Sequence, residues 1–143
     1  MQPERVMSSI PIGWSLIAAG LVSGTLLGLR FHDESFLGGY ASWTRRLLRL
    51  GHVACVALGM ANLLLAATVP AAPFAAALCL ALGGVAMPLA CLVVAFRPRW
   101  RPLFAAPVAL LLVAVFEVLF AVAAVRPGAT AGATSGATSG AMR

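Results

Sequence analysis

The chain has 143 residues, of which 62% are hydrophobic and only 10% are charged, and its mean hydropathy is +0.99. Soluble domains carry about 25% charged residues, so this composition excludes an ordinary soluble globular domain. The net charge of +6 comes from arginine alone, and these arginines flank apolar runs, which favours lipid headgroups over nucleic acid as their surroundings.

Four apolar segments follow one another, each long enough as a helix to cross a hydrocarbon core of about 30 Å. We expect transmembrane spans at residues 10–29, 47–69, 74–96 and 103–125. Two prolines in the VPAAP sequence at 69–73 predict a tight turn between the second and third spans. The sequence therefore predicts an all-α fold, an integral membrane four-helix bundle formed by residues 10–126.

Short segments of different composition flank this transmembrane domain. Residues 1–9 form a short N-terminal segment, and residues 127–143 repeat the motif GAT with small residues between the copies. Such a repeat buries too little apolar surface to offset the entropy of ordering it. We expect the tail to be disordered.

The distribution of arginine predicts an orientation in the membrane. Seven arginines lie in the first and third connections (Arg30, Arg45, Arg46, Arg49, Arg97, Arg99 and Arg101), and three lie on the other side (Arg5, Arg126 and Arg143). Since cytoplasmic loops carry the excess of positive charge, we expect both connections in the cytoplasm and both termini on the non-cytoplasmic side. The strings at 51–64 and 83–96 resemble those of small bacterial four-span proteins in general, which implies the bacterial cytoplasmic (inner) membrane.

The first span carries three glycines, Gly20, Gly24 and Gly28, spaced four residues apart. Glycines at this spacing make a smooth helix face that allows another backbone to approach closely. We expect this face to pack against another span of the chain, against a second copy of the chain, or against another membrane subunit.

The second span carries its polar residues on one helical stripe. His52, Cys55, Gly59, Asn62 and Ala66 are spaced three, four, three and four residues apart. The flanking residues are aliphatic, so we expect lipid to contact them and the stripe to face protein.

Glu117 is the only acidic residue within a span. A charged group at membrane depth costs about 2.5–3.5 kcal/mol on insertion scales, so such residues are functional by default. Counted from the span ends, Asn62 and Glu117 lie at similar depth, which predicts an intramembrane polar pair. The pair would be a structural clasp between helices or a site for protons or ions; otherwise Glu117 would meet a basic residue of a partner.

Four residues near the expected cytoplasmic side form a candidate metal or haem site: His52, Cys55, Met87 and Cys91. Imidazole, thiolate and thioether ligands suit Cu(I) and, less well, zinc, and a single histidine suits haem with a second ligand from another chain. The alternative is structural, because buried cysteines commonly pack as small hydrophobic residues. The sequence assigns no cofactor.

The first connection has the composition of an interfacial loop. Its polar and aromatic residues include His32, Asp33, Glu34, Trp43, Arg45, Arg46 and Arg49. Acids can pair with these arginines, and Ser42 or Thr44 can cap the second span. We expect a loop folded onto the membrane surface or a docking surface for a partner.

The sequence contains no hydrolase, nucleotide-binding or zinc-protease motif. We therefore expect no enzyme activity. The main hypothesis is a non-catalytic accessory or structural subunit of a larger membrane complex, and the alternatives are a metal- or haem-handling protein or a small proton- or ion-coupled transporter using Glu117.

Overall fold

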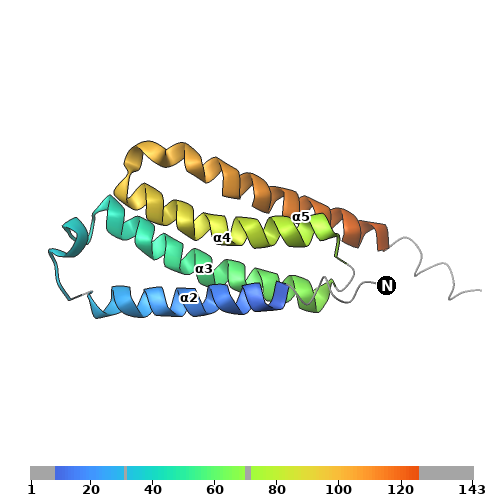
Figure 1. The fold of residues 1–143 in the computed structure, drawn as a ribbon, viewed down its shortest axis with the longest axis horizontal. Helices are drawn as coiled ribbons and strands as arrows, with labels where there is room; N and C mark the ends of the chain where they lie inside the picture. Colours follow the sequence, from blue (N-terminus) through green and yellow to red (C-terminus); the bar gives the residue numbers. More distant parts are fainter. Residues whose placement is uncertain (1–8, 31, 70–71, 126–143) are drawn as a thin grey trace, which may run out of the picture.

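The computed structural model describes residues 9–30, 32–69 and 72–125, and every regular element in these ranges is helical. The long helices are α2 (Ser9–Leu29), α3 (Trp43–Thr68), α4 (Phe74–Phe96) and α5 (Ala105–Val125), and the short 3₁₀ helices are η1 (Phe36–Gly38) and η2 (Pro98–Phe104) (Figure 1). Within these ranges, four helices are long and apolar enough to cross a membrane. The all-helical prediction with four apolar helices is therefore confirmed.

Parts of the chain on which predictions were made lie outside the described residues. These are the N-terminal residues 1–8, residues 70–71 of the expected proline turn, and residues 126–143 with the GAT repeats. Arg5, Arg126 and Arg143 lie there as well.

Helix α3 begins at Trp43, four residues before the expected span, because polar groups cap its first turn. Ser42 Oγ accepts a hydrogen bond from the backbone N–H of Arg45 at 3.3 Å. Thr44 Oγ1 donates to the carbonyl oxygen of Ala95 at 3.0 Å, which ties the start of α3 to the end of α4. Leu47 packs near this point with Val94 in a small buried cluster.

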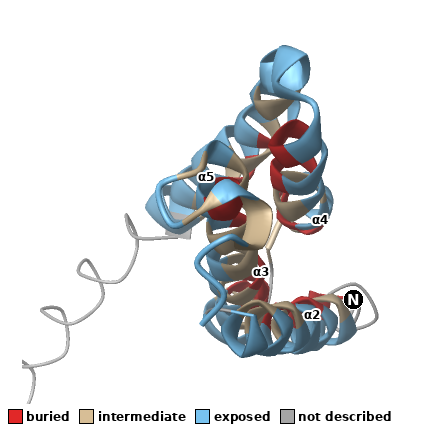
Figure 2. Cartoon of the chain, turned by 90° about the vertical axis from the view of Figure 1, so that its left-hand side faces the viewer, coloured by how far each residue is buried: buried red, intermediate tan, exposed pale blue. Residues whose placement is uncertain are grey.

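The four long helices pack mainly in chain order, α2 on α3, α3 on α4 and α4 on α5, while α2 and α4 touch only briefly. Helices α2 and α5 therefore lie at the two ends of the series (Figures 1 and 2). Burial follows this order: 39% of the most apolar window of α4 is buried, against 17% for α2 and 11% for the segment Pro98–Ala124 that contains α5. The outer faces of α2 and α5 are thus not covered by other helices of the described ranges.

Helices α2 and α3 approach each other closely where Gly13 meets Gly59. A Cβ at Gly59 would lie 2.7 Å from the carbonyl oxygen of Gly13 and 3.1 Å from the backbone nitrogen of Ile17. Helices α4 and α5 meet similarly at Gly83, where a Cβ would lie 2.9 Å from the Leu111 side chain. Glycine at these contacts lets apolar helices pack backbone against side chain, as in membrane proteins.

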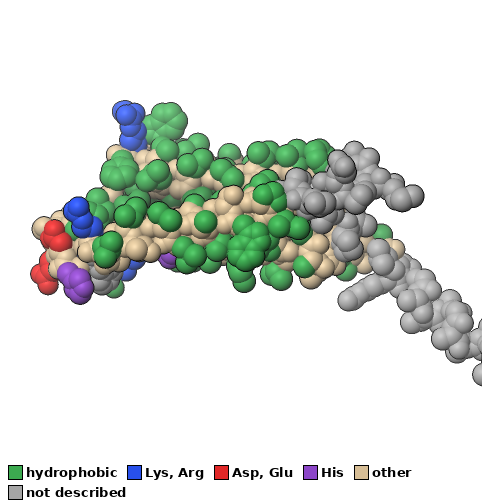
Figure 3. Space-filling view, turned by 60° about the horizontal axis from the view of Figure 1, so that its bottom comes forward, with side chains coloured by type: hydrophobic (Ala, Val, Ile, Leu, Met, Phe, Trp, Pro, Cys, Tyr) green, Lys and Arg blue, Asp and Glu red, His purple; other side chains and the backbone are tan. Residues whose placement is uncertain are grey.

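Charged side chains gather at one end of the helices. We define the loop end as the connection between α2 and α3 together with η2; seven arginines, two acids and His32 lie in or beside it. Figure 3 shows the arginine, acidic and histidine side chains at this end and a hydrophobic surface along the helices. This segregation is typical of a protein whose helices lie in hydrocarbon and whose loops lie in water.

Candidate functional site

The imidazole of His52 on α3 is held by the backbone of α2. Its Nδ1 atom lies 2.7 Å from the carbonyl oxygen of Gly20. A carbonyl oxygen can only accept a hydrogen bond, so Nδ1 carries the proton and donates it. In the neutral ring Nε2 then keeps its lone pair. Within the described part of the chain, Nε2 has no hydrogen-bond partner.

The same imidazole packs against Gly24, because glycine has no side chain to occupy that space. A Cβ at Gly24 would come 2.7 Å from Nδ1 and 3.0 Å from Nε2 of His52. Any larger residue at this position would displace the ring. Gly24 and the Gly20 carbonyl together fix the position and the tautomer of His52.

His52 lines an apolar groove of about 320 Å³. We call it the His52 groove. Helices α2 and α4 form its walls and α3 contributes Gly51, His52 and Cys55, while Leu16, Pro88 and Cys91 are among the other lining residues. The hydroxyl of Ser23, which also lines the groove, donates to the carbonyl oxygen of Gly20 at 2.9 Å. His52 is the only one of the described lining residues with nitrogen in its side chain.

The structure brings His52, Cys55 and Cys91 to this one groove, whereas Met87 does not line it. Both cysteines are buried free thiols. No group of three His, Cys, Asp or Glu side chains in the described ranges is arranged to hold a metal ion. The expected set of metal ligands is therefore not assembled into a three-ligand site.

Asn62 is fully buried between α3 and α4. Its Nδ2 donates to the carbonyl oxygen of Leu58, one turn earlier on its own helix, at 2.9 Å. Nδ2 also lies 3.4 Å from where a Cβ of Gly84 would be. The Oδ1 atom is buried without a hydrogen-bond partner.

The expected pair of Asn62 and Glu117 is not formed. Asn62 contacts Gly84, and the adjacent Gly83 contacts Leu111 of α5. Glu117 lies six residues further along α5, about 9 Å at 1.5 Å per residue. Counting depth from the span ends missed this offset, because α3 begins at Trp43 and α5 at Ala105, whereas the spans were expected to begin at 47 and 103.

Glu117 is half-buried on α5, one turn after the buried Ala114. It makes no hydrogen bond or ion pair with another described residue. The rest of α5 is apolar, and its exposed side chains include Val113, Phe116 and Phe120. Among the described residues, Glu117 is thus an acid without a partner on the helical segment with the smallest buried share.

Of the three glycines in the first span, two pack within the chain. A Cβ at Gly20 would lie 2.6 Å from Val56 Cγ2 and 3.1 Å from Cys55 Cβ, and Gly24 meets His52, whereas Gly28 has no atom within 4 Å of its Cβ position. The first turns of α3 pack on α4 instead of following α2 to its end. The face of α2 that contacts α3 therefore extends toward Gly13, a residue that the four-residue spacing of the other glycines did not identify.

At the loop end, arginines lie over aromatic rings. Arg45 and Arg49 lie 5.4 and 4.9 Å from the centroid of Tyr40, and Arg101 lies 4.8 Å from that of Trp43. These cation–π contacts hold the guanidinium groups against aromatic rings, the residue type that is enriched at membrane–water interfaces. The expected loop residues Trp43, Arg45 and Arg49 all take part in these contacts, and Tyr40 is the ring that Arg45 and Arg49 share. The spacing of Arg45 and Arg49 by one helical turn is the signal for a shared ring.

The acidic residues of this loop do not all serve as partners for arginine. The backbone N–H and the hydroxyl of Ser35 donate to Asp33 Oδ1 at 2.9 and 2.6 Å. These hydrogen bonds hold the pKa of Asp33 below its ordinary value. A pocket of about 520 Å³ in the loop is lined by His32, Glu34, Tyr40 and Arg45. Arg46 on α3 is exposed.

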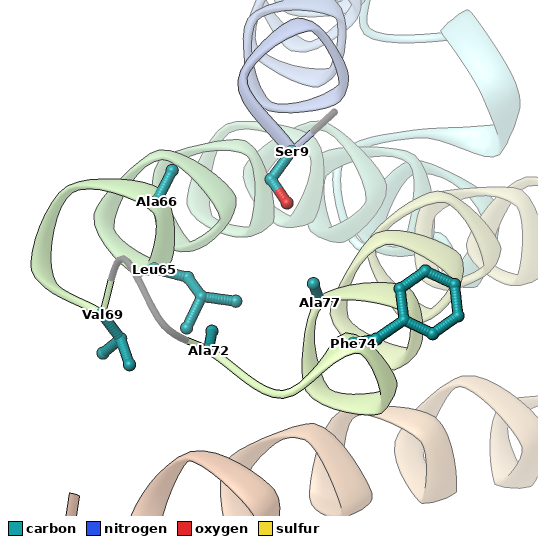
Figure 4. Close-up of a pocket in the computed structure, with 7 residues that line it drawn as sticks. All are labelled: Ser9, Leu65, Ala66, Val69, Ala72, Phe74 and Ala77. Atoms are coloured by element: carbon teal, nitrogen blue, oxygen red, sulfur yellow. The ribbon is translucent and has the colours of Figure 1, made fainter. Parts of the chain in front are cut away.

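A further cavity lies at the opposite end of the helices, between Ser9, Leu65 and Phe74 (Figure 4). Its volume is about 10 Å³, which is room for at most one water molecule. It is too small to be a ligand site. A second large groove, of about 300 Å³, is apolar and lies where α3, α4 and α5 meet, with Leu64, Ala114 and Val118 among its lining residues.

Comparison with protein-family models, with curated proteins and with solved structures finds no match to this chain. The class of the protein therefore follows from its own fold and composition. Four helices in the described ranges are long and apolar enough to cross a membrane, which indicates a membrane protein.

Proposed function

We propose that the protein is a non-catalytic integral membrane protein and an accessory or structural subunit of a larger complex in the bacterial cytoplasmic membrane. The observation that supports this best is the state of α5. This helix is covered mainly by α4, and its single ionisable residue, Glu117, has no partner in the described part of the chain.

The energetics of an acid in hydrocarbon support a partner at this position. Ionisable residues in transmembrane segments face other protein or water and pair with a complementary group. The surface around Glu117 is apolar, with Val113 and Phe120 exposed one turn before and after it. A transmembrane helix of another subunit that carries a basic residue or a hydrogen-bond donor at this depth would satisfy the carboxyl group.

The same helices argue against self-association through the glycine face of α2. Gly20 and Gly24 are already occupied by α3. We therefore expect other membrane subunits to bind at α5 rather than at the glycine face of α2. The arginine-rich loop end supports a cytoplasmic position for the two connections, with the chain ends on the other side.

Native purification tests the proposal. The tagged full-length protein is extracted in a mild detergent, and its complex is sized before and after crosslinking. We expect a particle containing other membrane proteins, a several-fold loss of them in Glu117→Gln, and their complete loss in Glu117→Arg. Glu34→Gln, which changes an exposed acid of the loop, is the matched control and should leave the complex intact. A monodisperse particle near 14.7 kDa plus detergent, with no crosslinked partner, would contradict the proposal.

A further inference from the structure

The His52 groove has the form of a small-molecule site rather than of a gap between helices. Its volume of about 320 Å³ lies within the range of ligand pockets, which begins at about 300 Å³. Helices α2 and α4 flank it and scarcely touch each other, while α3 forms the floor at Gly51. A molecule dissolved in the bilayer can therefore enter it from the side.

His52, a lining residue of this groove, has one ring nitrogen without a hydrogen-bond partner among the described residues. Nδ1 of His52 donates to Gly20, so the neutral ring offers the Nε2 lone pair as an acceptor. The hydroxyl of Ser23 already donates to Gly20 and does not reach Nε2 as a donor. Hydrocarbon supplies no donor, and an acceptor left unsatisfied in such surroundings costs about 1–3 kcal/mol.

We propose that the His52 groove binds a membrane-soluble quinol, whose ring hydroxyl donates a hydrogen bond to His52 Nε2. The apolar wall, with Leu16, Val85 and Leu89, suits a substituted ring, and the side facing lipid leaves room for an isoprenoid tail. The chemistry of the site asks for one hydrogen-bond donor on an apolar body, and a quinol headgroup supplies both. The proposal concerns binding alone and goes beyond the role of accessory subunit.

Hydrogen-bond complementarity separates this occupant from the others that an apolar groove accepts. A lipid acyl chain fills the volume but leaves Nε2 without a donor. Only a donor-bearing ligand makes His52 and Gly24 necessary for occupancy, which gives the test its variants.

Binding is measured with the full-length protein in nanodiscs of quinone-free phosphatidylcholine under anaerobic conditions, with empty nanodiscs as background. The probe is a benzoquinol with a decyl tail, and the comparison compound is its dimethyl ether, which has the same ring and no donor. We expect retention of about one quinol per chain and about tenfold weaker retention of the ether, since a lost hydrogen bond of about 1.4 kcal/mol corresponds to a factor of ten.

Variants and a spectroscopic readout identify the site. His52→Phe, which keeps a ring without the acceptor, and Gly24→Ala, which displaces the imidazole, should weaken quinol retention about tenfold, whereas Gly28→Ala should not. In ¹⁵N spectra, the Nε2 resonance of His52 should shift on addition of quinol and not of ether, which a purely structural role would not produce. Equal retention of the ether, unchanged retention by folded His52→Phe, or no retention by the wild type would overturn the proposal.

Discussion

Gly13 of α2 and Gly59 of α3 lie backbone against backbone: a Cβ on either residue would come within 2.9 Å of the carbonyl oxygen of the other. This contact sets the distance between the two helices over the half of the molecule opposite the loop end. The same approach brings Gly20 close enough to accept the hydrogen bond from His52. Helix packing and the position of the candidate site thus depend on the same glycines.

Substitution of Gly59 therefore should disturb both packing and site. We expect Gly59→Ala to lower the free energy of unfolding by about 1–3 kcal/mol, because the added methyl group forces α2 and α3 apart. Thermal unfolding in detergent measures the change. The control is Gly28→Ala, whose added methyl group enters open space, so that stability is unchanged or raised by less than about 1 kcal/mol. Equal effects of the two substitutions would contradict the assigned contact.

The helices of the fold were predictable because apolar runs and prolines mark them directly. The exact start of α3 was not, since it depends on hydrogen bonds of Ser42 and Thr44, one of which reaches Ala95 at the far end of α4. The order in which the helices pack could not be predicted from the sequence either, because apolar side chains of similar type cover every helix face. Hydropathy reports that a helix is apolar and not which neighbour it meets.

The candidate site was predictable in its residue types but not in its pairings. The stripe of the second span identified inward-facing residues, and Cys55 and Asn62 are indeed buried. The pairing of Asn62 with Glu117 required the relative depth of helices, which follows from contacts such as that of Gly83 with Leu111. The hydrogen bond from His52 to Gly20 joins a side chain to a backbone carbonyl. Since every residue has such a carbonyl, the sequence does not indicate which one accepts the hydrogen bond.

Asn62 offers a test of its own burial. Because Oδ1 has no partner, the amide costs stability that a similarly shaped apolar side chain would not. We expect Asn62→Leu to leave the free energy of unfolding unchanged or to raise it by up to about 1–3 kcal/mol. A decrease in the free energy of unfolding of about 2 kcal/mol or more would mean that Oδ1 has a hydrogen-bond partner.

The loop between α2 and α3 should lose order in acid through Asp33. The pKa of Asp33 is lowered from its ordinary value of 3.8 because Ser35 donates two hydrogen bonds to the carboxylate. The stabilisation is therefore fully present above that ordinary value and is lost as the pH falls through the lowered value of the folded state. Amide exchange at Ser35, followed against pH, measures it. In Asp33→Asn the pH dependence should disappear, and persistence there would assign it to another group.

The orientation of the chain is tested by labelling single cysteines in a variant without Cys55, Cys79 and Cys91. A cysteine introduced by Ser35→Cys at the loop end should react with a membrane-impermeant maleimide only after the membrane is opened. A cysteine introduced by Ala72→Cys, between α3 and α4, should react in intact cells. The reverse pattern would place the arginine-rich connections outside.

The most direct test of the account is photo-crosslinking from α5 in native membranes. A photoreactive residue is placed at Val113 or Phe120, which are 45% and 74% exposed on either side of Glu117, and at Leu21 or Leu26 on α2 as controls. We predict protein adducts from the α5 positions that disappear in Glu117→Arg, and lipid adducts from α2. Lipid adducts alone from α5, or protein adducts that persist in Glu117→Arg, would contradict a subunit that docks through this helix.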